Sequence, residues 1–153
     1  DAAAALDWLQ TFKPEARTVW VGGFSFGAWI GMQLLMRRPE IGGFISVSPP
    51  SNMYDFSFLA PCPSSGLIIH GDADEIVPQE AVLRLVDKLA MQKGIVVDYE
   101  NIEGAGHVYG PHLEMMLGRC GVYLDRRLAE DARIAEVAAA AAAAIEDARA
   151  VAS

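Results

Sequence analysis

The 153-residue sequence contains only two cysteines and three histidines. Cys62 lies between two prolines and Cys120 lies in a helix-like segment. This pair has neither the spacing of a metal site nor the cysteine density of a secreted disulfide framework. We therefore expect two free thiols in a reducing cytoplasm and no bound metal.

Positive charge is also scarce. Twelve lysines and arginines stand against 20 aspartates and glutamates, which gives a formal net charge of −8. Nucleic-acid and anionic-membrane surfaces select clustered Lys and Arg, so the composition argues against both kinds of partner. A membrane span needs roughly 18 consecutive apolar residues. No run reaches that length, because Glu136 and Glu146 bracket the longest apolar stretch.

The sequence starts without an initiator methionine and without the pattern of a secretory signal peptide. Its first residues, D-A-A-A-A-L-D-W-L-Q, are typical of the interior of a helix. Leu6, Trp8 and Leu9 share a helical face within residues 1–12, and Pro14 ends the pattern. We expect the chain to begin inside a longer protein.

Apolar runs and helical patterns alternate along the next hundred residues. Thr18 to Val21 is a short β-branched and aromatic run before two glycines, which is typical of a strand buried on both faces. A helix over 79–92 is expected to place Val82, Leu83, Val86 and Leu89 on one stripe. The other expected elements are strands at 43–47, 66–70 and 95–100, helices at 26–38 and 111–128, and a Pro- and Ser-rich loop through residue 65.

This alternation predicts an α/β fold, with a parallel sheet and helices on both of its faces. Ligands of such sheets bind beyond the carboxyl ends of the strands. Functional motifs should therefore gather just after residues 22, 70 and 100.

The alanine-rich tail, residues 129–153, is predicted to be one long helix outside the domain formed by residues 1–128. Its larger apolar residues recur at spacings of three and four, which favours a helix with a narrow stripe of small side chains. Such a stripe could pack on a partner helix and make a homo-oligomer. The composition favours the alternative, a solvated or merely docked helix.

The clearest chemical motif is Gly23-Phe24-Ser25-Phe26-Gly27, a G-x-S-x-G pattern between a predicted strand and a predicted helix. Small residues at 23 and 27 are expected to let the backbone approach closely while Ser25 Oγ projects above the sheet. A serine hydroxyl is a poor nucleophile near neutral pH and needs a base, which itself needs an orienting group. By itself the motif is also compatible with a plain glycine-rich turn.

A carboxylate and an imidazole follow two later strands. Asp74 is the predicted orienting acid, because it lies deep in the loop before Ile-Val-Pro, whereas Asp72 is expected to tie the turn. His107 is the predicted base, since it follows Gly104-Ala105-Gly106 in a loop after the strand at 95–100. His70 ends a strand and His112 begins a helix, so packing or capping accounts for them.

The order serine, acid, histidine, each member after a successive strand, is the order of α/β hydrolases. The segments G-F-S-F-G-A, M-R-R-P-E-I, F-I-S-V-S-P-P, Y-D-F-S-F-L-A-P-C-P-S-S-G, H-G-D-A-D-E-I-V-P and G-A-G-H resemble a bacterial serine-hydrolase branch of that family over about residues 1–128. The resemblance implies Ser25 as nucleophile, His107 as base and Asp74 as acid. It also implies several strands before residue 1, with a loop that supplies an oxyanion donor.

The expected function is hydrolysis of a small ester-like molecule through an acyl-enzyme, without a metal or organic cofactor. The amide of Phe26 is the one oxyanion donor that the sequence assigns. Phe24, Met53, Tyr54 and Phe56 are candidates for the substrate pocket, although core packing is the favoured alternative for the aromatics, including Phe26 and Trp29. Two other functions stay open: a non-catalytic binding protein with this fold, and a scaffold that self-associates through its tail.

Overall fold

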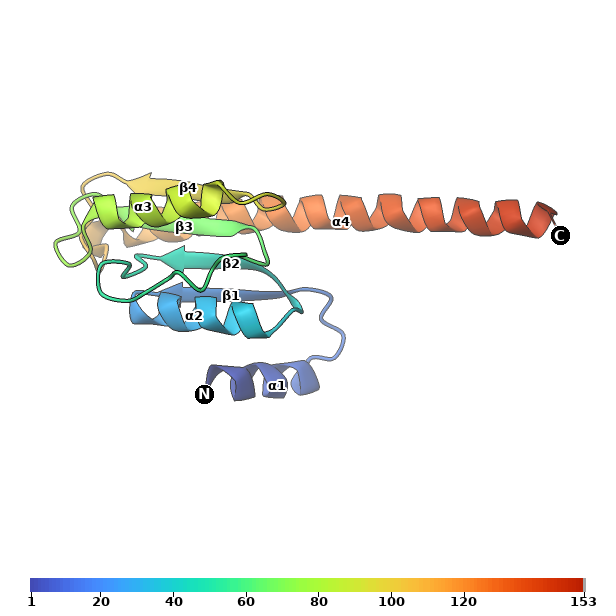
Figure 1. Cartoon of the computed structure of the whole chain (residues 1–153), viewed down its shortest axis with the longest axis horizontal. Coiled ribbons are helices and arrows are strands. Elements are labelled where there is room, and N and C mark those ends of the chain that lie inside the picture. The colour runs from blue at the N-terminus through green and yellow to red at the C-terminus, as the bar shows by residue number, and fades with distance from the viewer. Residues whose placement is uncertain (153) are drawn as a thin grey trace. The chain divides into compact units, whose positions relative to one another are not determined.

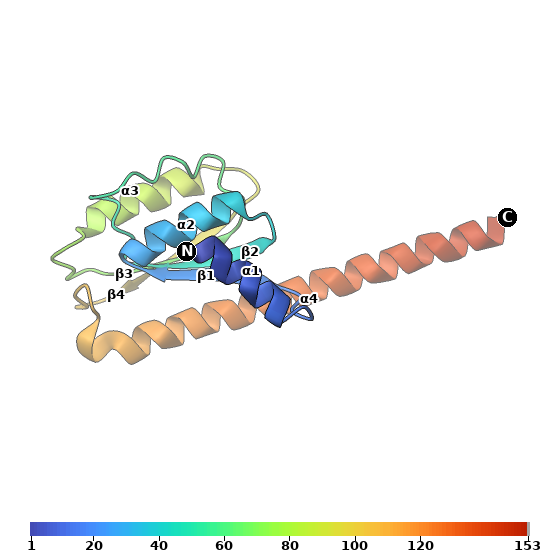
Figure 2. The same cartoon turned by 90° about the horizontal axis from the view of Figure 1, so that it is seen from below.

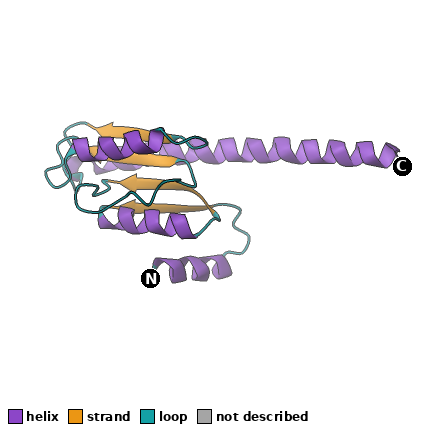
Figure 3. Ribbon diagram, viewed as in Figure 1, coloured by secondary structure: helices purple, strands orange, loops and turns teal. Residues whose placement is uncertain are grey.

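The computed structural model describes residues 1–152 and divides the chain into two compact units, residues 1–117 and the residues from 118 onward. Figures 1 and 3 show the elements along the chain. They are α1 (Ala2–Phe12), β1 (Val19–Phe24), α2 (Phe26–Arg37), β2 (Ile41–Val47), β3 (Gly66–Gly71), α3 (Gln79–Ala90), β4 (Val97–Ile102), the 3₁₀ turn η1 (Gly110–His112) and α4 (Leu113–Ala152).

The four described strands form one sheet in the order β1-β2-β3-β4, and every neighbouring pair is parallel. This confirms the predicted α/β fold. Helix α2 connects β1 to β2 and α3 connects β3 to β4, whereas residues 48–65 connect β2 to β3 through turns alone. Helices α2 and α3 lie on the same face of the sheet (Figure 2). Because the strands are parallel and adjacent in order, their carboxyl ends meet at one edge.

The core of residues 1–117 is built around β3, all six residues of which are buried. A strand buried on both faces typically has a continuous apolar run, which here consists of Leu67, Ile68 and Ile69. Phe44 of β2 and Leu35 of α2 are also fully buried. The interior strands are therefore fixed by burial, and the residues that follow them are held in place.

The buried face of α3 differs from the predicted stripe. Ala81, Val82, Leu85 and Leu89 are buried, while Leu83 is exposed. The prediction included both Val82 and Leu83, although neighbouring residues on an α-helix point about 100° apart. Spacings of three and four, as in 82, 85 and 89, keep side chains on one face.

Several boundaries also differ from the prediction; β4, for example, covers Val97–Ile102 and not 95–100. Strand β1 runs on through Gly22 and Gly23 to Phe24, because these residues pair in register with Ile45, Ser46 and Val47 of β2. The predicted helices at 111–128 and 129–153 are one continuous helix, α4, and Ser153 lies outside the described residues. The predicted division at residue 128 falls inside α4, and a separate role for the tail stays a prediction. Within residues 1–152, no helix has the length and apolar character that crossing a membrane requires.

Candidate active site

Ser25 lies in a strained turn between β1 and α2. Its backbone has φ 52° and ψ −121°, a left-handed conformation that costs a residue other than glycine about 1–3 kcal/mol. The turn is held by a hydrogen bond from Ser25 N to Val47 O of 2.8 Å. A Cβ on Gly23 would lie 2.2 Å from Gly27 O, so the expected need for glycine holds there. At Gly27 the expectation is wrong, because a Cβ there would meet nothing within 4 Å.

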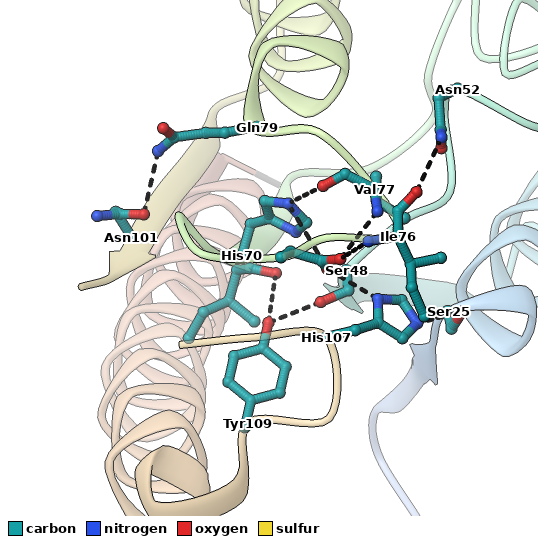
Figure 4. Close-up of polar contacts among 12 residues, drawn as sticks. Ser25, Ser48, Asn52, His70, Ile76, Val77, Gln79, Asn101, His107 and Tyr109 are labelled. Atoms are coloured by element: carbon teal, nitrogen blue, oxygen red, sulfur yellow. Dashed lines mark hydrogen bonds and ion pairs between the residues drawn. The ribbon is translucent and has the colours of Figure 1, made fainter. Parts of the chain in front are cut away.

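His107 lies between the serine and a carboxylate. Its Nε2 is 2.9 Å from Ser25 Oγ, and its Nδ1 is 2.7 Å from Asp74 Oδ2. An ionised carboxylate can only accept hydrogen bonds, so Nδ1 carries the hydrogen and, in the neutral ring, Nε2 is left to accept the Ser25 hydroxyl hydrogen. Both His107 and Asp74 are buried. The structure thus brings Ser25, His107 and Asp74 into one hydrogen-bonded chain. Figure 4 shows His107 beside Ser25.

Asp74 is fixed by its own loop. Its Oδ1 accepts hydrogen bonds from the amides of Ile76, at 2.9 Å, and Val77, at 2.8 Å. Burial raises the pKa of Asp74, but the hydrogen bonds from Val77, His107 and Ile76 outweigh it, so the pKa lies below the ordinary value of 3.8. Asp74 is therefore ionised at neutral pH, with one oxygen held by the backbone and the other facing His107.

The Asp74 loop is supported from two sides (Figure 4). Asn52 Nδ2 donates to Ile76 O at 3.0 Å. His70, at the end of β3, contacts Val77 O through Nε2 at 2.9 Å. Burial lowers the pKa of His70, so the ring is neutral, and because a carbonyl only accepts, the ring hydrogen lies on Nε2. His70 Nε2 is 3.8 Å from Asp74 Oδ2, too far for a hydrogen bond, which agrees with the predicted packing role.

Asp72 ties the loop after β3 to the end of β4 and the loop that follows it, whereas the prediction was that it ties its own turn. Its carboxylate accepts hydrogen bonds from Asn101 Nδ2 at 3.0 Å and from Gly104 N at 2.7 Å. The two loops also approach closely at Gly71, where a Cβ would lie 2.2 Å from Ala105 O. The loop that carries His107 is therefore anchored at its start. His112 lies in η1, with its ring near Gly104, where a Cβ would lie 3.8 Å from His112 Nε2.

Sequence reasoning missed a second anchor, formed by Ser48 and Tyr109. Ser48 follows β2 directly, and its Oγ lies 2.9 Å from Tyr109 Oη. Tyr109 Oη also donates to Ile69 O at 3.3 Å. The available signal was position, since Ser48 directly follows a strand and Tyr109 is two residues after His107.

The predicted pocket residues divide into two groups. Phe24 and Phe26 are 45% and 51% exposed, so the expectation that they pack in the core is wrong, and Met53 and Tyr54 are exposed as well. The Phe24 ring centroid is 5.2 Å from that of His107, and the Phe26 and Tyr54 centroids are 5.4 Å apart. Phe56, in contrast, is buried in the core and contacts Phe58. Its place in a pocket stays a prediction.

The loop from 51 to 58 is joined to α2 through Trp29. The Trp29 and Tyr54 rings are tilted to each other with centroids 4.9 Å apart, and Trp29 Nε1 donates to Asp55 O at 3.0 Å. This contact holds the exposed aromatic rings close to the Ser25 turn. Within residues 1–152, no group of three or more His, Cys, Asp or Glu side chains is placed to hold a metal ion, and Cys62 and Cys120 form no disulfide.

Comparison with known proteins gives a consistent picture, although no protein-family model matches the chain. A protein of unknown function from Agrobacterium tumefaciens, described as a candidate α/β hydrolase, is 58% identical with a TM-score of 0.81, over 84% of this chain and 59% of that one. An α/β serine hydrolase without a lid, from Xanthomonas campestris, is 30% identical with a TM-score of 0.73, over 82% of this chain and 55% of that one.

A curated relative extends the comparison. An uncharacterised protein of Rickettsia prowazekii is 55% identical over 113 residues, which are 71% of this chain and 48% of that protein. The chain thus spans about half the length of the curated relative it matches. Taken with the parallel sheet and the turn at Ser25, these likenesses show that the chain has part of an α/β-hydrolase fold and belongs with the α/β hydrolases.

Proposed function

We propose that the protein is a serine hydrolase that transfers the acyl group of an ester-type substrate to water. The observation that carries the proposal is the pair of hydrogen bonds from Ser25 Oγ to His107 Nε2, at 2.9 Å, and from His107 Nδ1 to Asp74 Oδ2, at 2.7 Å. A nucleophile within hydrogen-bond reach of a base that a third group orients is the arrangement of nucleophilic catalysis. The serine hydrolases among its structural relatives support the same reaction class.

The reaction follows from the proton positions. His107 Nε2 takes the Ser25 proton as Oγ bonds to the substrate carbonyl carbon, and the C=O π electrons move to the oxygen. The ionised Asp74 then stabilises the positive imidazolium that forms. The intermediate collapses by breaking the bond to the alcohol oxygen, which receives the proton from His107 and leaves an acyl-enzyme. Water, deprotonated by His107, repeats the sequence and releases the carboxylic acid.

The oxyanion is assigned to the amide of Phe26, the first residue of α2. The first amides of an α-helix have no acceptor inside the helix and lie at the positive end of its dipole. An amide there can donate to the negative oxygen of the intermediate without losing a native hydrogen bond. One such donor contributes about 2.7–4 kcal/mol to the stabilisation of the transition state.

The exposed apolar side chains around Ser25 favour a substrate with an apolar acyl or alcohol group. Phe24 lies beside the His107 ring, and Phe26 contacts Tyr54 of the opposite loop. We expect Phe24→Ala to raise KM for p-nitrophenyl hexanoate more than for p-nitrophenyl acetate, because the longer chain loses more buried area. An equal change for both esters would remove Phe24 from the pocket.

Replacing the nucleophile tests the function itself. Ser25→Ala removes the attacking oxygen and should lower kcat for p-nitrophenyl acetate by about 10⁶, as loss of a catalytic serine does in hydrolases of this type. Ser57→Ala is the matched control, since Ser57 is exposed and hydrogen-bonds only locally to Asp55. Hydrolysis that survives in Ser25→Ala would remove Ser25 as the nucleophile, whereas a wild-type protein without hydrolysis would favour the non-catalytic binding protein.

A further inference from the structure

Three residues other than glycine have positive φ within residues 1–152, and all three lie at the carboxyl edge of the sheet. They are Ser25 at 52°, Ser48 at 48° and Tyr109 at 64°. Such strain persists only where the surrounding structure enforces it, and it clusters at functional sites. Ser25 is the assigned nucleophile, whereas the other two residues are bonded to each other at 2.9 Å. Their strain therefore calls for an explanation at the same site.

Residues 47 and 48 contact both the turn that carries Ser25 and the turn that carries His107. Val47 O accepts the hydrogen bond from Ser25 N that fixes the nucleophile turn. The next residue, Ser48, bonds Tyr109, whose own N–H donates to Gly106 O at 3.1 Å and closes the turn that contains His107. The position of His107 relative to Ser25 is thus set through Val47, the last residue of β2, and Ser48, which follows it. Figure 4 shows Ser48 beside Tyr109.

Ile69 O lies at the same place. This carbonyl accepts from Ser48 N at 2.9 Å and from Tyr109 Oη at 3.3 Å. In the bond between Ser48 Oγ and Tyr109 Oη either hydroxyl can be the donor. Ser48 is 0% and Tyr109 2% exposed, so water cannot replace either partner. Removing either hydroxyl breaks the buried bond between Ser48 and Tyr109 and favours movement of the turn.

We propose that Ser48 and Tyr109 are positioning residues, a hydrogen-bonded pair that holds His107 Nε2 at the proton of Ser25. The proposal rests on the acyl-transfer function proposed above. Both hydroxyls affect His107 through the turn that Tyr109 N closes with Gly106 O. A misplacement of about 1 Å in a catalytic group can cost about 10²-fold in rate, so loss of the pair should lower kcat by about 10- to 100-fold. KM should stay unchanged, because the exposed surface that would bind substrate is not altered.

The experiment compares Tyr109→Phe, Ser48→Ala and the double variant in the full chain, with p-nitrophenyl acetate as substrate. Each single variant should lower kcat with KM unchanged. The double variant should be no slower than the slower single variant, because both changes break the same interaction. Tyr99→Phe is the matched control: it also loses a phenol hydroxyl, bonded at 3.1 Å to Gln79 Nε2, but on β4 away from the His107 turn. Its kcat should match the wild type.

Titration with a fluorophosphonate reports the fraction of folded, reactive enzyme, so that kcat is corrected for any loss of stability. If Tyr109→Phe fails to fold, Ser48→Ala removes the same bond from the smaller side chain and takes its place. Wild-type kcat in these variants, or losses that multiply in the double variant, would overturn the positioning role. That outcome is distinct from failure of the proposed function, in which Ser25→Ala itself would retain hydrolysis.

Discussion

Replacing Asp74 by asparagine removes a charge while nearly preserving the shape of the side chain. The amides of Ile76 and Val77 donate to Oδ1 at 2.9 and 2.8 Å, so the asparagine oxygen takes that position. Its NH₂ group then faces His107 Nδ1, where Oδ2 now lies at 2.7 Å. Two donors cannot pair, so the ring adopts the tautomer with its hydrogen on Nε2. In that tautomer His107 cannot accept the Ser25 proton.

The expected loss is about 10⁴ in kcat, the size found when a triad aspartate elsewhere becomes asparagine and the wrong tautomer results. It corresponds to about 5 kcal/mol in the activation barrier. The assay is release of p-nitrophenol from p-nitrophenyl acetate near neutral pH, with circular dichroism to verify the fold.

Asp72→Asn is the matched control for this prediction. It lies two residues earlier in the same loop, and its carboxylate binds Asn101 and Gly104 rather than His107. We expect its kcat to fall far less than that of Asp74→Asn, because one anchor of the His107 loop is weakened while the tautomer of His107 is unchanged. If Asp74→Asn retained more than about a tenth of the wild-type kcat, the argument from the tautomer would be refuted.

Three further results are expected. Although burial raises the pKa of Asp74, hydrogen bonds from Val77 and His107 keep the pKa below 3.8. The charge of Asp74 therefore stabilises the fold above pH 3.8, and this contribution is lost as the pH falls through the lower pKa of the folded state. In urea unfolding, wild type and Asp74→Asn should therefore converge as the pH drops below 3.8, and a constant gap would contradict this. Gly23→Ala should destabilise the fold strongly, because its Cβ would overlap Gly27 O. Gly27→Ala should leave the free energy of unfolding unchanged or raise it by up to about 1 kcal/mol. Equal urea midpoints for the two variants would refute the steric argument. Deleting residues 129–153 should leave the number of chains per particle, measured by light scattering, unchanged. A smaller number of chains per particle would instead support the self-associating scaffold.

The sequence predicted much of the site because each member directly follows a strand. Ser25, Asp74 and His107 come after β1, β3 and β4, and a parallel sheet brings those strand ends to one edge. Residue type and order were thus enough to indicate which side chains meet. The distances between these side chains depend on the register of the strands, which the periodicity of the sequence does not determine.

Other features were beyond local pattern. Two adjacent glycines indicated the end of a strand, yet pairing with β2 carries β1 through them, because ladder hydrogen bonds override the local preference. The bond between Ser48 and Tyr109 joins residues 61 positions apart, which no local period encodes. The exposure of Phe24 and Phe26 likewise depends on which neighbours the fold supplies.

Labelling with a fluorophosphonate tests the central claim most directly, since only an activated serine reacts readily with this reagent. We predict one adduct per chain by intact mass, located on Ser25 by peptide mapping. The adduct should be absent in Ser25→Ala and form far more slowly in His107→Ala. No adduct on the wild-type protein, or an adduct on a different serine, would contradict the assignment of Ser25 as a nucleophile activated by His107 and Asp74.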